Sequence, residues 1–244
     1  SKMTSNILYS INNSESLKFL ENLMSEFFHE NTSNQRKRQI EEILEQFAQQ
    51  QDSWRHCIGY LIETQNEYAM IYCLSVLDNF ISKKWINLGA DKTQFRMTIW
   101  NYLLTRHRCV PIYIRNKICK LIVNIAKNDW PHDYSDFINN MIELLNSRET
   151  MALGLMLIQT AIEELTAESD DICVARRDQL TKLLTNEINL ILASLTNVME
   201  VILDKFVNFL TATPPPSPTQ SLDSQEEASF GKSKINFNTI IMFY

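Results

Sequence analysis

Apolar residues recur every three to four positions along most of the chain, from residue 14 to about residue 210. This spacing puts them on one face of a helix, so it predicts a series of amphipathic α-helices. In the clearest run, NEYAMIYCLSVLDNFISKKW, Met70, Leu74, Leu77 and Ile81 lie one turn apart and Trp85 closes the stripe. The expected helices start at about residue 14 and then cover 33–48, 52–64, 66–85, 91–107, 111–127, a segment after Pro131, 149–167 and about 172–211.

Short polar corners of about 2 to 8 residues separate the expected helices, which is the usual length between neighbouring helices of a bundle. Helix pairs recur at roughly 40 residues, the period of HEAT-type repeats, although residue identities do not repeat well. No strand pattern competes over any long stretch. The pattern therefore predicts an all-α fold, a right-handed α-solenoid of paired antiparallel helices of the HEAT or armadillo (ARM) type.

The two ends of the chain differ from this periodic region. We expect a flexible N-terminus over 1–13, helical repeats over 14–211, and a disordered linker rich in proline, serine and acidic residues, with an atypical apolar tail, over 212–244. Thr213 and Ser217 each precede a proline, so proline-directed phosphorylation is one interpretation. A stiff linker is the interpretation that we favour.

Composition supports long helices and a protein partner. The 244 residues include only four glycines and six prolines, too few for a chain rich in turns and strands. The formal charge is 23 − 29 = −6, which does not match a nucleic-acid backbone and suits a basic protein partner. There is no secretory signal and no apolar run of about 18 residues, so we expect a soluble intracellular protein that does not enter a membrane.

The five cysteines are odd in number and have no paired spacing. We interpret them as free, mostly buried thiols in a reducing compartment. They are Cys57, Cys73, Cys109, Cys119 and Cys173.

Motifs for catalysis, nucleotide binding or metal binding are missing from the sequence. It contains no GxxxxGK[ST], GxGxxG or GxSxG, and its four histidines form no HxxxH or HExxH pair. His56 and Cys57 are adjacent, but neighbours on a helix point about 100° apart, so a surface histidine beside a core cysteine is the better interpretation. We expect no enzyme activity, no cofactor and no metal.

Two charged stretches have an ordinary structural interpretation. The RKR triplet at 36–38 precedes Glu41, Glu42 and Glu45, which favours a salt-bridged helix face over a nucleic-acid or nuclear-localisation patch. The charges between 163 and 177 are typical of a polar corner between two helices.

The stretch KNDWPHDY interrupts the helical pattern with a proline. We expect Asp129 to cap a helix whose first turn contains Pro131, and Trp130 to fill the seam between helices. Since no histidine, cysteine or carboxylate is aligned with these residues, they predict a structural corner and not an active site.

The same corner carries a family resemblance. IRNKICKLIVNIAKNDWPHDYSDF, residues 114–137, resembles the exportin form of the karyopherin-β signature, and the stretch from Ile40 to Leu88 is similar to the importin-β N-terminal domain. The resemblance covers roughly 14–220: an importin-β N-terminal-like part to about residue 90, then exportin-like repeats. Together with LMSEFFHENTSNQRKRQIEEILEQFAQQ and TATPPPSP, these strings look most like the N-terminal part of the branch that exports actin–profilin.

The resemblance implies a binding function. Exportins hold the GTP-bound GTPase Ran on the second helices of their N-terminal repeats, bind cargo with it, and shuttle between nucleus and cytoplasm, with contacts to nuclear pore proteins. It therefore implies Ran-GTP and actin–profilin as partners of a monomeric receptor. Polar residues on those helices are the candidates for Ran contact: Asn79, Lys83, Arg115, Asn116 and Lys120.

Two alternatives stay open. Each candidate could be solvated or could pair between repeats, and Arg115 could stack beside Trp130 or bridge to a neighbouring helix. The whole chain could also be a generic HEAT or ARM scaffold for protein–protein interaction that does not depend on Ran.

Overall fold

The computed structural model describes residues 13–212, and all regular structure within that range is helical. The α-helices are α2 (Asn13–Phe28), α3 (Asn34–Ala48), α4 (Ser53–Glu63), α5 (Glu67–Lys84), α6 (Asp91–Arg106), α7 (Ile112–Asp129), α8 (Phe137–Glu143), α9 (Met151–Thr166) and α10 (Val174–Ala212). Two short 3-10 helices are η1 (Trp85–Leu88) and η2 (Leu144–Asn146). The terminal segments predicted to be flexible, including Thr213 and Ser217, lie outside the described residues.

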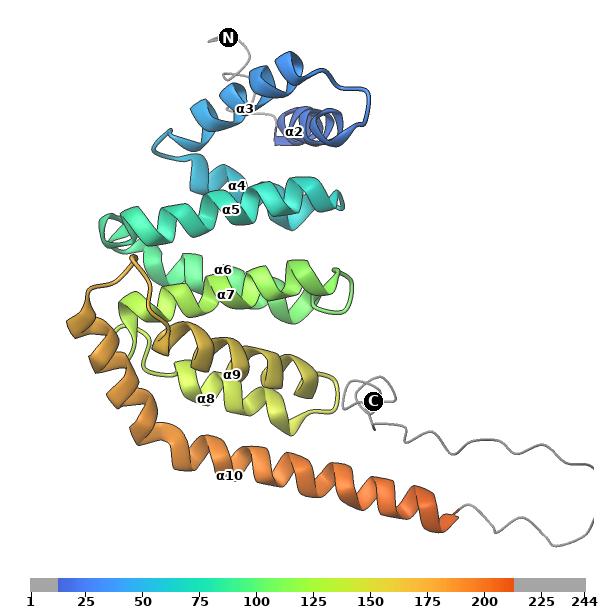
Figure 1. Cartoon of the computed structure of the whole chain (residues 1–244), viewed down its shortest axis with the longest axis vertical. Coiled ribbons are helices and arrows are strands. Elements are labelled where there is room, and N and C mark those ends of the chain that lie inside the picture. Colours follow the sequence, from blue (N-terminus) through green and yellow to red (C-terminus); the bar gives the residue numbers. More distant parts are fainter. Residues whose placement is uncertain (1–12, 213–244) are drawn as a thin grey trace, which may run out of the picture.

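The helices form an elongated stack of pairs (Figure 1). Helix α2 pairs with α3, α4 with α5, α6 with α7 and α8 with α9, and the long helix α10 follows at one end. The second helices also pack on one another, α5 against α7 and α7 against α9. Because each pair is covered by its neighbours along the stack, the expected all-α solenoid is confirmed. Its right-handedness and its division near residue 90 stay predictions.

The apolar stripe predicted in α5 faces the core. Met70, Leu74, Leu77 and Ile81 are all buried, and Trp85 at the start of η1 is buried with them. Burial of one such side chain stabilises the fold by about 1.5–3 kcal/mol relative to exposure. The periodic stripe therefore holds α5 between the pairs on either side.

An aromatic cluster joins the α4–α5 pair to α6. The ring centroid of Trp54 lies 5.6 Å from that of Phe80 and 5.5 Å from that of Phe95, and Trp85 contacts Phe95 edge-on at 5.2 Å. Such aromatic pairs contribute about 0.5–1.5 kcal/mol beyond the area that they bury. The cluster fixes how one repeat stacks on the next.

Helix ends follow local chemistry with one correction. Ser33, the first residue of the predicted helix 33–48, caps α3, because its hydroxyl accepts a hydrogen bond from the Arg36 amide at 3.2 Å. Pro111, the first residue of the predicted helix 111–127, lies instead at the N-cap, and α7 starts at Ile112. Its extended ψ of 155° keeps it outside the helix, while its carbonyl accepts the first helical hydrogen bonds.

For the corner at residues 129–131, the prediction that Trp130 is buried is correct, and the prediction that Asp129 caps a new helix is wrong. Trp130 is 4% exposed, as expected of a side chain in a seam. However, α7 runs through Asp129 and α8 begins only at Phe137, so Asp129 caps no helix and Pro131 starts none. The chain forms turns over 130–136, where the Asp129 carbonyl accepts a hydrogen bond from the Asp133 amide.

Candidate partner-binding surface

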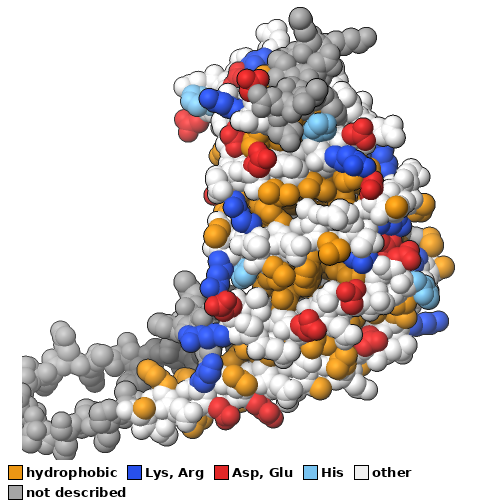
Figure 2. All heavy atoms as spheres, turned by 180° about the vertical axis from the view of Figure 1, so that it is seen from behind, with side chains coloured by type: hydrophobic (Ala, Val, Ile, Leu, Met, Phe, Trp, Pro, Cys, Tyr) orange, Lys and Arg blue, Asp and Glu red, His pale blue; other side chains and the backbone are white. Residues whose placement is uncertain are grey.

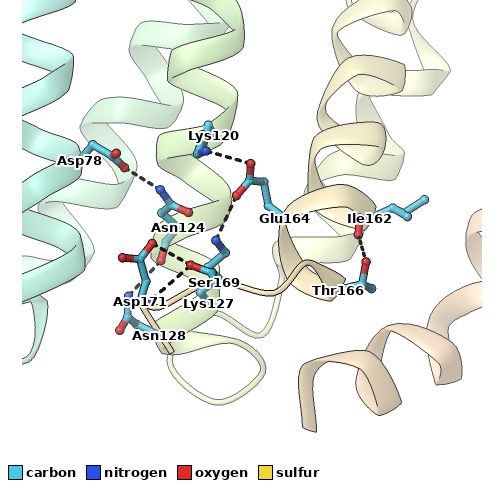
Figure 3. A network of polar contacts seen from close by, with 10 residues as sticks. All are labelled: Asp78, Lys120, Asn124, Lys127, Asn128, Ile162, Glu164, Thr166, Ser169 and Asp171. Atoms are coloured by element: carbon cyan, nitrogen blue, oxygen red, sulfur yellow. Dashed lines mark hydrogen bonds and ion pairs between the residues drawn. The ribbon is translucent and has the colours of Figure 1, made fainter. Parts of the chain in front are cut away.

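A row of polar side chains crosses the second helices α5, α7 and α9 (Figure 3). Asn124 Nδ2 of α7 donates a hydrogen bond of 2.6 Å to Asp78 Oδ1 of α5. Lys120 Nζ and Lys127 Nζ, also of α7, form ion pairs of 3.0 Å and 3.1 Å with the carboxylate of Glu164 on α9. We call these five residues the polar row, and they connect three consecutive helix pairs.

The spacing along α7 explains why one helix supplies three members of the row. Residues 120, 124 and 127 are separated by four and three positions, so they lie on the same side of an α-helix. That side lies between α5 and α9, with which α7 packs. The sequence of α7 therefore places both an amide and two ammonium groups at the joints between repeats.

The electrostatics of the row centre on Glu164. Burial disfavours its charged form, but the hydrogen bonds and positive charges of Lys120 and Lys127 outweigh this effect and lower the pKa of Glu164. The hydrogen bond to Glu164 raises the pKa of Lys120 in turn. Lys127 is almost fully buried, and a buried ammonium is tolerated only with a partner of opposite charge. The Lys127–Glu164 ion pair thus holds α7 against α9 in the interior of the structure.

The candidates for Ran contact occupy two different environments. Lys120 belongs to the polar row, so it pairs between repeats, while about half of its side chain remains exposed. Asn79 and Lys83 on α5 and Asn116 on α7 are exposed. Since α5 and α7 pack side by side, these four residues are carried by one pair of adjacent helices.

Arg115 lies apart from this surface. It lines a cavity with His107 and Glu149 at the start of α7. Trp130 is at the other end of the same helix, 15 positions away, or about 22 Å at the helical rise of 1.5 Å per residue. The alternative that Arg115 stacks beside Trp130 is therefore wrong, because α7 continues without a break between them.

The corner at the end of α7 is tied to both of its neighbours. Lys92 Nζ of α6 forms an ion pair of 3.2 Å with Asp129 Oδ1, whose side chain is buried. From α10, the Arg176 guanidinium donates to the carbonyls of Lys127, at 3.0 Å, and Trp130. These bonds satisfy carbonyl groups that the end of a helix leaves without partners. The corner is a mechanical joint, in agreement with its structural interpretation.

Arg36 of the basic triplet at 36–38 makes its salt bridge with an unexpected partner. It forms a two-pronged salt bridge with Glu26 of α2, with Nε–Oε1 at 2.7 Å and Nη2–Oε2 at 3.0 Å. The expected salt-bridged surface is therefore present, but this carboxylate comes from the preceding helix and not from Glu41, Glu42 or Glu45 one turn away.

The cysteines are free thiols, and most of them are packed in the core. All five are free; Cys57, Cys73 and Cys119 are buried, whereas Cys109 and Cys173 are exposed. Burial, together with the neighbouring Cys73 thiol, raises the pKa of Cys57 well above its usual range, so its reactive thiolate form is suppressed.

Residues 13–212 contain no group of three histidines, cysteines or carboxylates arranged to hold a metal ion. None of their helices combines the length and apolar character needed to cross a bilayer.

The sequence prediction missed most of the polar row and the role of Arg176. The available signal was the presence of polar residues in an apolar stripe. Asn124 and Lys127 are the two polar residues of the buried segment from Leu121 to Lys127. A buried polar residue requires a partner, so its presence predicts a contact to another element. The periodic pattern alone does not identify Asp78 or Glu164 as that partner.

Comparison with known proteins gives consistent matches over most of the chain. The family pattern described as Importin-beta N-terminal domain matches residues 40–105, and the one described as Exportin 1-like protein matches residues 111–219. Exportin-6 of Mus musculus and of Homo sapiens are each 45% identical over 205 residues, covering 84% of this chain and 18% of those proteins. Exportin-6 of Dictyostelium discoideum is 23% identical over 198 residues, covering 77% of this chain. The chain spans less than a fifth of the length of these relatives.

Proposed function

We propose that this chain, which belongs to the exportin family of nuclear transport receptors, acts as the Ran-GTP-binding N-terminal region of such a receptor. The observation that carries the proposal is the order of the two family patterns, Importin-beta N-terminal domain and then Exportin 1-like protein, along one α-solenoid. A solenoid suits a receptor because small rotations between repeats add up to a change in curvature. Ran-GTP and cargo then favour each other's binding if both prefer the same curvature.

The proposed Ran contact is the exposed polar surface of α5 and α7. Asn79, Lys83, Asn116 and Lys120 offer amide and ammonium donors there, with Lys83 and Lys120 supplying positive charge. Lys120 contributes through its exposed half, because Glu164 already holds its ammonium group. Arg115 remains a candidate only for a partner that also reaches the cavity at the start of α7.

The cargo and the route belong to the same proposal. The resemblance of the sequence to the branch that exports actin–profilin supports actin–profilin as cargo and contacts with nuclear pore proteins. Similarity to proteins named Exportin-6 supports movement between nucleus and cytoplasm. The chain would act as a monomeric binding protein, without catalysis, cofactor or nucleic acid.

The test measures the affinity of the full 244-residue chain for Ran loaded with a non-hydrolysable GTP analogue and for Ran loaded with GDP. We expect binding only to the GTP form and a weakening of several-fold in the double variant Lys83→Ala, Asn116→Ala. Lys18→Ala, an exposed change on α2, the first helix of its pair, serves as the matched control and is expected to bind like wild type. Equal or absent binding in the two nucleotide states would favour a scaffold that does not depend on Ran.

A further inference from the structure

A small cavity with a basic lining lies where the α6–α7 corner, the start of α9 and the second half of α10 meet. Lys and Arg side chains follow the edge of the molecule that lies on the left in Figure 2. The residues of the cavity wall that matter most are His107, Arg108, Arg115, Arg148, Glu149 and Ile202. We call this feature the basic cavity.

The charge of the basic cavity is opposite to that of the chain. Arg108, Arg115 and Arg148 contribute three positive charges against one negative charge from Glu149, so the balance is 3 − 1 = +2 with His107 neutral. The whole chain carries −6. Met151 and Ile202 form part of an apolar wall, and an apolar wall strengthens the attraction between an arginine and an anion.

The contacts inside the cavity leave cationic groups available. Arg108 Nη2 donates a hydrogen bond to the Glu149 carbonyl at 3.4 Å, and His107 Nε2 lies 3.3 Å from the same oxygen. These contacts hold the corner after α6 to the corner before α9. Among the ion pairs of residues 13–212, none includes Arg108 or Arg115. Arg115 Nε is shielded from solvent and has no hydrogen-bond partner among those residues. A shielded donor in this state requires an explanation, and an acceptor from a ligand supplies one.

The start of α9 adds to the positive potential. The cavity includes Met151 and Ala152 from the first turn of this 16-residue helix, and no side chain caps that turn. The first amide groups of a helix carry partial positive charge and attract anions. This contribution supports the arginines and would not define a site alone.

The size of the cavity limits the ligand. Its volume is about 180 Å³, whereas pockets for small-molecule ligands span roughly 300–1,000 Å³. One side chain of a peptide is therefore a better fit than a cofactor. We propose that the basic cavity binds an aspartate or glutamate side chain from an acidic peptide segment of a partner protein. This site is separate from the proposed Ran surface on α5 and α7.

The test measures fluorescence anisotropy of a fluorescein-labelled hexaglutamate peptide with the full chain, and uses labelled hexaglutamine as the neutral probe. We expect binding of hexaglutamate that weakens as salt rises, because the interaction is electrostatic. Arg108→Gln and Arg115→Gln should each weaken binding by about tenfold, as expected from the loss of a charge-assisted hydrogen bond. Arg38→Gln removes one exposed charge outside the cavity and should leave the affinity unchanged.

Arg108→Gln decides the test, because Arg108 is exposed, so its replacement is compatible with folding, and it is no candidate for Ran contact. Circular dichroism of each variant confirms that it is folded. Equal binding of hexaglutamine and hexaglutamate, or wild-type affinity of a folded Arg108→Gln variant, would overturn the proposal. Loss of peptide binding with Ran-GTP binding intact would support the basic cavity as a second site.

Discussion

Asn124 is the residue whose side chain ties α7 to α5. Its side-chain amide donates a hydrogen bond of 2.6 Å to Asp78, and only 5% of the residue is exposed. In Asn124→Ala this buried bond is lost and Asp78 loses its donor, so we expect the free energy of unfolding to fall by about 1–3 kcal/mol. Urea unfolding measures the change. The control is Asn116→Ala on the same helix, where the residue is exposed and the expected change stays within about 0.5 kcal/mol. Equal losses in both variants would contradict a special role for the buried amide.

Glu164 makes the joint between α7 and α9 sensitive to pH. Its pKa is lowered in the folded protein by Lys120 and Lys127, against the opposing effect of burial, from an ordinary value of 4.5. A carboxylate whose pKa is lower in the folded state contributes stability above its unfolded pKa, and this contribution is lost as pH falls through the folded pKa. We therefore expect Glu164→Gln to lower the melting temperature at neutral pH.

The difference in melting temperature between Glu164→Gln and wild type should disappear in acid. Melting curves of wild type and Glu164→Gln between pH 7 and pH 3 should begin to converge once the pH falls below 4.5. They should continue to converge as the pH falls through the lower folded pKa, where Glu164 becomes protonated in the wild type as well. Glu163→Gln is the matched control, because Glu163 is exposed and its carboxylate accepts a hydrogen bond of 2.9 Å from Gln159 Nε2 of its own helix. A deficit in Glu164→Gln that is independent of pH would show that the ion pairs do not cause it.

At the scale of the helices, the α7–α8 corner depends on Trp130. Its ring packs near Phe137, with centroids 6.0 Å apart, and its carbonyl receives Arg176 of α10. Trp130→Ala removes a large buried side chain and leaves a cavity, so we expect a loss of about 3–5 kcal/mol. His132→Ala, an exposed change in the same turn, should leave the unfolding midpoint nearly unchanged. A neutral effect of Trp130→Ala on melting would mean that the seam repacks around the smaller side chain.

The two helical glycines Gly59 and Gly154 provide a matched test of packing between elements. A Cβ at position 154 of α9 would lie 2.9 Å from Leu145 Cδ2 and 3.0 Å from Leu144 Cβ, closer than such contacts allow, whereas a Cβ at position 59 of α4 meets nothing within 4 Å. Alanine is favoured over glycine in a helix by about 1 kcal/mol. Gly59→Ala should therefore stabilise the protein by up to about 1 kcal/mol.

Gly154→Ala should have the opposite sign. Overpacking costs about 1–3 kcal/mol, which exceeds the gain in helix propensity. Thermal unfolding of the two variants side by side separates the effects, because both make the same chemical change in a helix. If Gly154→Ala were as stabilising as Gly59→Ala, the close approach of α9 to η2 would not constrain the sequence.

The helices could be predicted from the sequence more completely than the joints between them. Stripes such as Met70, Leu74, Leu77 and Ile81 determine which face of a helix is buried, and this is a local property with a fixed period. The sequence predicts a helix start at Pro131, whereas the chain forms turns over 130–136, since a proline shortly after an aspartate is typical of both. What decides between them is the set of partners on α6 and α10, Lys92 and Arg176, which lie 37 and 46 positions from the residues they contact.

Prediction of the candidate surface met the same limit. Exposed positions such as Asn79 and Lys83 follow from the helical period, because they lie opposite the buried stripe. Pairing of Lys120 with Glu164 and convergence of Arg108, Arg115 and Arg148 on one cavity depend on how two neighbouring repeats stack. Residues from different repeats meet only through tertiary packing, which a periodic pattern does not encode.

At the scale of the whole molecule, the stack ends on a helix that is covered along only part of its length. Helix α10 packs on the neighbouring pair with Leu180, Leu184, Ile191 and Val198. Large apolar side chains on its other sides, most of them in its second half, are exposed: Leu190, Leu192, Met199, Val201, Leu203, Phe206, Val207, Phe209 and Leu210. In a solenoid each repeat covers the face of its neighbour, and an outer face of this kind binds apolar probes and other chains.

This difference along α10 gives a prediction in which position, not residue type, decides the outcome. Leu203 and Phe206 are 54% and 49% exposed, so the double variant Leu203→Gln, Phe206→Gln should keep the unfolding midpoint while it reduces the fluorescence of the apolar dye ANS. Leu180→Gln on the same helix is the control. Leu180 is fully buried, so this change should cost about 2–5 kcal/mol, increase ANS fluorescence and lower the unfolding midpoint. A large loss of stability in the double variant would mean that the far half of α10 is already covered in the monomer.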